Sequence, residues 1–245
     1  MDYGPFGFME AYSPSWCMWV GGGDHFSFVN QPAAAGKNFA TFCSAVSPLL
    51  DPAGTKRAGE VLLGFDRVAK EELAEAFRRK LGLQTFAERG IHLYGELDAL
   101  MQQTPVDYTI LWRQLAKLPE ANLDVDQDAE SLLEPLRAAF YVGLDKSNQD
   151  RWEKWLRSWL ALLSEEGRTG SDIAKQMRHA SPKYVPREWM LEQAYKAAAQ
   201  GNFEKVHELQ SLFERPYDEQ PEFEDLYYRR AELPNLNRGG IAYMS

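Results

Sequence analysis

The sequence has little or nothing of three features that mark whole classes of protein. It contains only two cysteines, Cys17 and Cys43, which are too few for a disulfide-built secreted scaffold and have no histidine pair nearby for a zinc site. It has no run of eighteen apolar residues, which argues against a membrane-spanning helix. It also has no long run of Lys and Arg, and its net charge is −9, so we expect no nucleic-acid partner.

What the sequence does contain is enough apolar material for a packed core. Hydrophobic residues make up 44% of the 245 residues and aromatic residues 13%, which suffices for one large domain or two small ones. Apolar side chains recur every three or four residues through most of the chain, as in helices with one buried face. We therefore expect a mainly α fold.

Polar residues at the expected helix starts predict N-terminal caps. These residues are Asp51, Asp107, Asn148, Ser171 and Asn202. The first of them is expected to open one long helix that runs almost to Gly82 and belongs to the core. The acidic residues 120–134 lack the glycine and glutamate of a calcium loop in register, so we expect an exposed linker there.

Two features of the expected helices allow a functional interpretation beside a structural one. Arg113 would suit phosphate binding, but a structural salt bridge is the favoured interpretation. Trp152, Trp155 and Trp159 share one helix face, which would suit a ligand groove, although buried packing is the commoner use of such a stripe.

The stretch at the start of the chain looks most like a site. Residues 2–12 read DYGPFGFMEAY, and two glycines and a proline in this stretch rule out a regular helix. An Asp followed two positions later by Gly is how protein kinases present a carboxylate to the metal on ATP. The same spacing is common in exposed turns, so the motif by itself leaves both interpretations open.

More of the chain supports the first interpretation. Residues 2–12, with Pro14 and the Asn-Gln-Pro of residues 30–32, resemble the selenoprotein O family of kinase-like proteins that transfer AMP. Further blocks follow in the family's order and at close to its spacings, at residues 97–101, 107–109, 112–115, 182–189 and 215–217. Each block alone is weak, but together they make the resemblance specific.

The resemblance implies the C-terminal lobe of a protein-kinase-like fold with a helical extension. The family's N-terminal lobe and catalytic loop have no counterpart here, so we expect a fragment that is inactive alone and binds ATP weakly or not at all. Five parts are expected: a metal-binding DYG and activation-segment-like loop, a helical lobe, an acidic linker with a helix, a C-terminal helical extension and a tail. They cover residues 1–31, 32–118, 119–147, 148–233 and 234–245.

The activity that the resemblance implies is transfer of AMP from ATP to Ser, Thr or Tyr hydroxyls of target proteins. Asp2 is the one catalytic-centre position that carries over, as a ligand of Mg²⁺ or Mn²⁺, and Asp2 and Gly4 are the expected nucleotide-binding residues. ATP and protein substrates are therefore the expected partners. By resemblance, the compartment is the mitochondrion in a eukaryote and the cytoplasm in a bacterium.

Two smaller expectations come from the same resemblance. A loop cysteine of some members pairs with a residue near the C-terminus, which makes Cys17 a candidate redox residue. Cys17 lies one place early, however, so a half-buried thiol without that role is the favoured interpretation. Members end with a cysteine or selenocysteine before a terminal Ser-Ser, and this chain stops at Ser245. We therefore expect that a selenocysteine codon was read as a stop.

Two other functions remain compatible with the residues. An ordinary phosphate-transferring kinase-like enzyme would share the metal-binding Asp, and label on the α or the γ phosphate of ATP separates it from an AMP transferase. A non-catalytic helical interaction module would need neither Asp2 nor a metal.

Overall fold

The computed structural model describes residues 7–17 and 24–232, and residues 24–232 form helices joined by turns and loops. Only isolated β-bridges and no named strands occur in the described ranges, so the expected mainly α fold is confirmed. None of the helices described there is long and apolar enough to cross a membrane. The chain divides into a core unit, Met1–Ser13 with Phe77–Ser245, and a hairpin unit, Pro14–Ala76. The five-part division stays a prediction.

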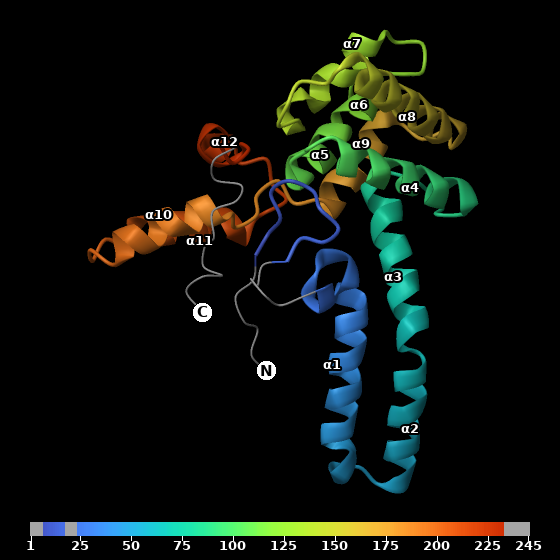
Figure 1. Cartoon of the computed structure of the whole chain (residues 1–245), viewed down its shortest axis with the longest axis vertical. Coiled ribbons are helices and arrows are strands. Elements are labelled where there is room, and N and C mark those ends of the chain that lie inside the picture. The colour runs from blue at the N-terminus through green and yellow to red at the C-terminus, as the bar shows by residue number, and fades with distance from the viewer. Residues whose placement is uncertain (1–6, 18–23, 233–245) are drawn as a thin grey trace. The chain divides into compact units, whose positions relative to one another are not determined.

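The hairpin unit consists of helices joined by short turns (Figure 1). Its elements are η1 (Asp24–Phe26), η2 (Phe28–Asn30), α1 (Gln31–Val46), η3 (Ser47–Leu49), α2 (Pro52–Leu63) and most of α3 (Phe65–Lys80). The helices α1 and α2 lie side by side and run antiparallel. Asp51 caps α2 as expected, because its side chain accepts a hydrogen bond from Gly54 N at 2.6 Å.

The long helix expected from Asp51 almost to Gly82 is wrong in two respects. It is two helices, because the chain breaks at Gly64 between α2 and α3. It is also not core material, since neither α2 nor α3 contains a buried residue, and only Leu81, just beyond α3, is fully buried. The apolar spacing is helical, but a hairpin gives each helix few neighbours against which to bury its stripe.

The core unit contains the later helices. They are α4 (Glu88–Gln103), α5 (Tyr108–Leu115), α6 (Lys117–Glu120), α7 (Ala129–Leu133), η4 (Glu134–Ala139), α8 (Lys146–Glu165), α9 (Gly170–Ala180), α10 (Glu188–Ala198), α11 (Glu204–Glu214) and α12 (Pro221–Tyr227). The cap expected at Asn202 is wrong by one residue, because Phe203 is the N-cap of α11, although Asn202 Oδ1 accepts a hydrogen bond from Glu204 N at 2.9 Å.

The expected caps in this unit are partly right. Asp107 caps α5, as the sequence predicts. The caps expected at Asn148 and Ser171 are wrong, because Asp145 caps α8 and Thr169 caps α9. In both cases another acceptor lies two or three residues earlier in the sequence, and the helix begins there.

The tryptophan stripe of α8 is buried packing, as favoured from the sequence. Trp152, Trp155 and Trp159 are at most 3% exposed, and the rings of Trp155 and Trp159 stack at 5.7 Å. Their indole N–H groups are used internally, since Trp159 Nε1 donates to Leu81 O and Trp155 Nε1 to Leu93 O, each at 2.9 Å. A second buried cluster joins the C-terminal helices and consists of Tyr184, Met190, Ala194, Leu209, Leu212 and Tyr227.

Candidate functional site

The segment that follows the DYG motif is fixed on the core unit. Asp2 and Gly4 lie outside the described residues, so their roles as metal and nucleotide ligands stay predictions. The described chain begins at Gly7, five residues after Asp2. Met9 and Tyr12 are both buried, so the chain is anchored in the core from Met9 onward.

Backbone pairing with the stretch before α5 holds this segment in place. Tyr12 N donates to Val106 O, and Tyr108 N donates to Glu10 O, both at 2.9 Å. On its other side, Val106 forms an antiparallel bridge with Phe140. The segment behind the motif is therefore the outer member of three extended stretches.

A buried ion cluster reinforces the pairing. Arg187 Nη1 donates to Asp107 Oδ2 at 2.7 Å, and Arg187 Nη2 donates to Asp107 Oδ1 at 2.9 Å. Arg187 also pairs with Glu10, and Tyr141 donates its hydroxyl to Asp107 at 3.3 Å. Arg187 and Asp107 are at most 2% exposed. We call Arg187, Asp107 and Glu10 the anchor cluster.

The anchor cluster has two carboxylates around one guanidinium. Burial raises the pKa of Glu10, and Arg187 opposes that rise. Burial alone would lower the pKa of Arg187, but Asp107 and Glu10 raise it above its ordinary value, so Arg187 stays charged. Loss of Arg187 would leave two carboxylates close together in a dry environment, which is a costly arrangement.

A row of aromatic rings connects the anchored segment to the end of α3. Tyr12 stacks on Tyr108 at 5.3 Å, and Tyr108 meets Trp112 edge-on at 6.0 Å. Lys80 Nζ lies 5.1 Å from the centre of the Trp112 ring and donates to Ser181 Oγ at 3.3 Å. Burial lowers the pKa of Lys80 from 10.5 to about 8.

This lowered pKa predicts a pH dependence that Lys80→Met should remove. Between pH 8 and 10 the folded protein releases the Lys80 proton while the unfolded chain keeps it, so stability should rise with pH. Raised tyrosine pKa values act in the opposite direction only above about pH 10, the ordinary tyrosine value. Urea unfolding should show that the wild type gains up to about 1.4 kcal/mol per pH unit over Lys80→Met. Parallel pH profiles for the two proteins would contradict the assignment.

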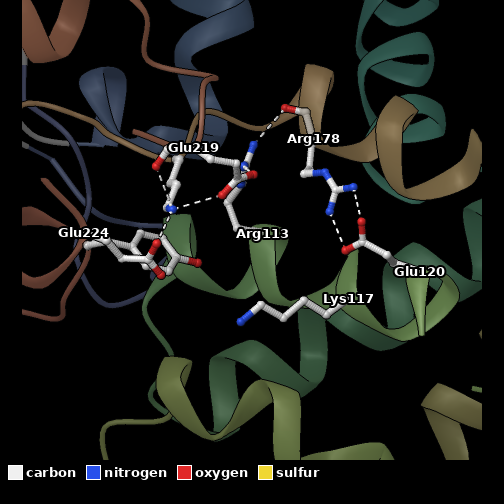
Figure 2. Close-up of a pocket in the computed structure, with 8 residues that line it drawn as sticks. Arg113, Lys117, Glu120, Arg178, Glu219 and Glu224 are labelled. Carbon is white, nitrogen blue, oxygen red and sulfur yellow. Dashed lines mark hydrogen bonds and ion pairs between the residues drawn. The ribbon is translucent and has the colours of Figure 1, made fainter. Parts of the chain in front are cut away.

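A charged cavity of about 370 Å³ lies elsewhere on the core unit (Figure 2). It is lined by Arg113, Lys117, Glu120, Arg178, Lys183, Glu219, Glu224 and Tyr228. Most of these charges pair with one another: Lys183 Nζ donates to Glu219 at 2.9 Å and to Glu224 at 2.8 Å, and Arg178 forms two bonds with Glu120. The cavity is therefore a charge network that ties α5 and α9 to the segment around α12.

Arg113 belongs to this network. Its Nη1 donates to the carbonyl oxygens of Arg178, Ser181 and Tyr217 at 3.2 to 3.3 Å, and its Nη2 pairs with Glu219. Both terminal nitrogens of Arg113 are therefore engaged by oxygen atoms of the protein. The structure supports the favoured salt-bridge interpretation of Arg113 over a phosphate role.

A metal site is not assembled by the described residues. Within residues 7–17 and 24–232, no group of three or more His, Cys, Asp or Glu side chains is placed to hold a metal ion. Glu10, the first described carboxylate after the motif, pairs with Arg187 through Oε2. Cys17 is half-buried, in agreement with the favoured interpretation, and its redox role stays a prediction.

Sequence reasoning did not find the anchor cluster. Glu10, Asp107 and Arg187 each lie inside a block that carries the family resemblance, at residues 2–12, 107–109 and 182–189. Only the helix-capping role of Asp107 was predicted. The signal that was present is a charged residue of the right sign in each of three blocks that are far apart in the chain.

A family model described as Protein adenylyltransferase SelO matches residues 1–214. Three bacterial relatives carry the name protein nucleotidyltransferase YdiU. The relative from Flavobacterium johnsoniae is 31% identical to this chain, and the match covers 95% of this chain and 44% of the relative. The relative from Aromatoleum aromaticum is 32% identical, with 100% of this chain and 45% of the relative covered. The relative from Thioalkalivibrio sulfidiphilus is 33% identical, with 91% of this chain and 43% of the relative covered. The chain thus spans less than half the length of these relatives.

Proposed function

The chain belongs to the SelO family of protein adenylyltransferases, and on this premise we propose that it is one part of an enzyme that transfers AMP from ATP to Ser, Thr or Tyr hydroxyls of target proteins. The observation that carries the proposal is the anchoring of residues 9–12, which follow the DYG motif by a few positions. A carboxylate that binds the metal on a nucleotide must be held in a fixed position by the surrounding chain. The anchor cluster fixes the segment that follows the motif.

The chemistry requires attack by a target hydroxyl oxygen on the α-phosphorus of ATP. A P–O bond forms to that oxygen, the bond between the α-phosphorus and the oxygen bridging to the β-phosphate breaks, and pyrophosphate leaves. The hydroxyl proton passes to a base or to water. Positioning and charge neutralisation supply most of the rate in phosphate transfer. Positioning is the contribution of the described residues, through Arg187, Asp107 and the backbone pairing at Tyr12.

Asp2 would hold a divalent cation, and Gly4 would allow the backbone to turn beside the nucleotide. A bound Mg²⁺ or Mn²⁺ neutralises phosphate charge in such reactions. One carboxylate supplies too few ligands to bind a metal ion or a nucleotide on its own. We therefore propose a kinase-like arrangement in which this chain is the C-terminal lobe with a helical extension. The remaining ligands would lie in the part of the relatives that the chain does not match.

We expect the isolated chain to transfer no AMP, because the proposal places most of the groups that hold ATP in the part of the relatives that the chain does not match. The measurement is incorporation of label from ATP into an acceptor protein. The full-length Aromatoleum aromaticum relative is the positive control, and it should incorporate label from the α phosphate and not from the γ phosphate. Incorporation from the γ phosphate would indicate a kinase. Turnover by the isolated chain that disappears in Asp2→Ala would contradict the expected inactivity.

A further inference from the structure

The hairpin unit exposes many large apolar side chains. Leu49, in the turn after α1, is 84% exposed, and Leu63, at the end of α2, is 87% exposed. Other exposed apolar side chains of this unit include Val29, Phe42, Leu50, Val61, Val68 and Leu73. Scattered exposed apolar residues are ordinary, but such a concentration on one small unit marks a surface that another chain segment covers.

The contact inside the hairpin is only a narrow seam. The ring of Phe39 in α1 lies 5.6 Å from that of Phe65 in α3, measured between ring centres, and both side chains remain partly exposed. In α1 to α3, only Ala34 is buried, whereas α8 of the core unit buries six residues. A helical layer normally buries its apolar stripe against a second layer, and the helices within the hairpin unit do not supply one another with such a layer.

The apolar residues also project on more than one side. Successive helix residues are rotated by about 100° around the axis, so Val61 and Leu63 flank the half-buried Leu62. A flat two-fold contact with a second copy of the hairpin would cover one flank and leave the other in water. Covering both requires an occupant that extends around the hairpin.

We propose that the hairpin unit is the docking surface for the polypeptide that the full-length relatives carry beyond the part matched here. The three relatives match over 43 to 45% of their length, so more than half of each relative is available as the occupant. Apolar surface of this kind is typical of permanent interfaces, which resemble a core cut in half. The inference rests on the proposed function, in which the chain works together with that remaining part.

Side-chain footprinting tests the proposal directly. The chain alone and the chain joined in one polypeptide to the unmatched part of the Aromatoleum aromaticum relative would be oxidised by hydroxyl radicals. We expect oxidation of Leu49 and Leu63 to fall at least tenfold in the joined protein. Ile91, which is 57% exposed on α4 of the core unit, is the matched control and should stay reactive. Equal reactivity of Leu63 in both proteins would overturn the proposal.

A pair of variants provides a second readout. Leu63→Asp should lower the melting temperature of the joined protein by several degrees and leave that of the chain alone unchanged, whereas Ile91→Asp should act equally on both. A dimer of the isolated chain that protects Leu63 would make a second copy the occupant and would also overturn the proposal. Protection of Leu63 without AMP transfer would count against the proposed function alone, and AMP transfer with Leu63 still reactive would count against the docking alone.

Discussion

Arg187→Met is expected to destabilise the core unit by about 3 to 5 kcal/mol, because it removes the only cation of the anchor cluster. The side chain of Met is similar in length, so the loss reflects charge more than volume. Asp107 is fully buried and would be left beside Glu10 without a compensating cation. Urea unfolding followed by tryptophan fluorescence measures this loss, because Trp152 and Trp159 are buried in the same unit.

Arg178→Met is the matched control for this substitution. Arg178 also forms a two-bond pair with a carboxylate, but its partner Glu120 is 45% exposed. Pairs at the surface contribute about 1 kcal/mol or less, so the expected loss is small. Equal losses of unfolding free energy for Arg187→Met and Arg178→Met would show that the anchor cluster stabilises the fold no more than an exposed ion pair does. Hydrogen exchange at the Tyr12 amide should accelerate only in Arg187→Met.

Gly170→Ala is expected to cost about 3 kcal/mol or more, at the upper end of what overpacking costs. Gly170 is the first residue of α9, and a Cβ atom there would lie 1.8 Å from Pro119 O. The obstacle is a backbone carbonyl of the α6 helix and not the end of a flexible side chain, so α9 and α6 must separate. Thermal unfolding of the variant measures the cost.

Gly95→Ala is the control for the glycine substitution. Gly95 lies inside α4, and nothing lies within 4 Å of the Cβ that alanine would add. Replacing a glycine in a helix by alanine removes chain flexibility in the unfolded state and should stabilise by about 0.5 to 1 kcal/mol. A Gly170→Ala variant as stable as the wild type would show that α6 and α9 are not packed as closely as described.

Local features of the fold could be predicted from the sequence. The caps at Asp51 and Asp107 and the buried tryptophan stripe of α8 depend on residues within one or two helical turns, where spacing carries the information. The break at Gly64 could not be predicted from apolar spacing, because the stripe continues through it. The spacing of apolar residues also does not show whether a helix has another element to pack against. For this reason α2 and α3, which are exposed, were expected to lie in the core.

For the candidate site, too, local features could be predicted from the sequence and long-range contacts could not. The motif at Asp2 and Gly4 is local and was found in the sequence, and its roles stay predictions. The anchor cluster joins Arg187 to Asp107, 80 residues apart, and to Glu10, 177 residues apart. Such pairings depend on the tertiary fold, and a single sequence contains no periodic signal for them.

Transfer of AMP by the joined protein is the measurement that tests the central claim most directly, namely that Asp2 contributes to an ATP-using centre. The chain joined to the unmatched part of the Aromatoleum aromaticum relative should incorporate label from the α phosphate of ATP into protein. Asp2→Ala should reduce incorporation by about two orders of magnitude or more, and Asp225→Ala, an exposed aspartate of α12, should leave it unchanged. Incorporation that is the same in Asp2→Ala and in the unsubstituted protein would contradict the account.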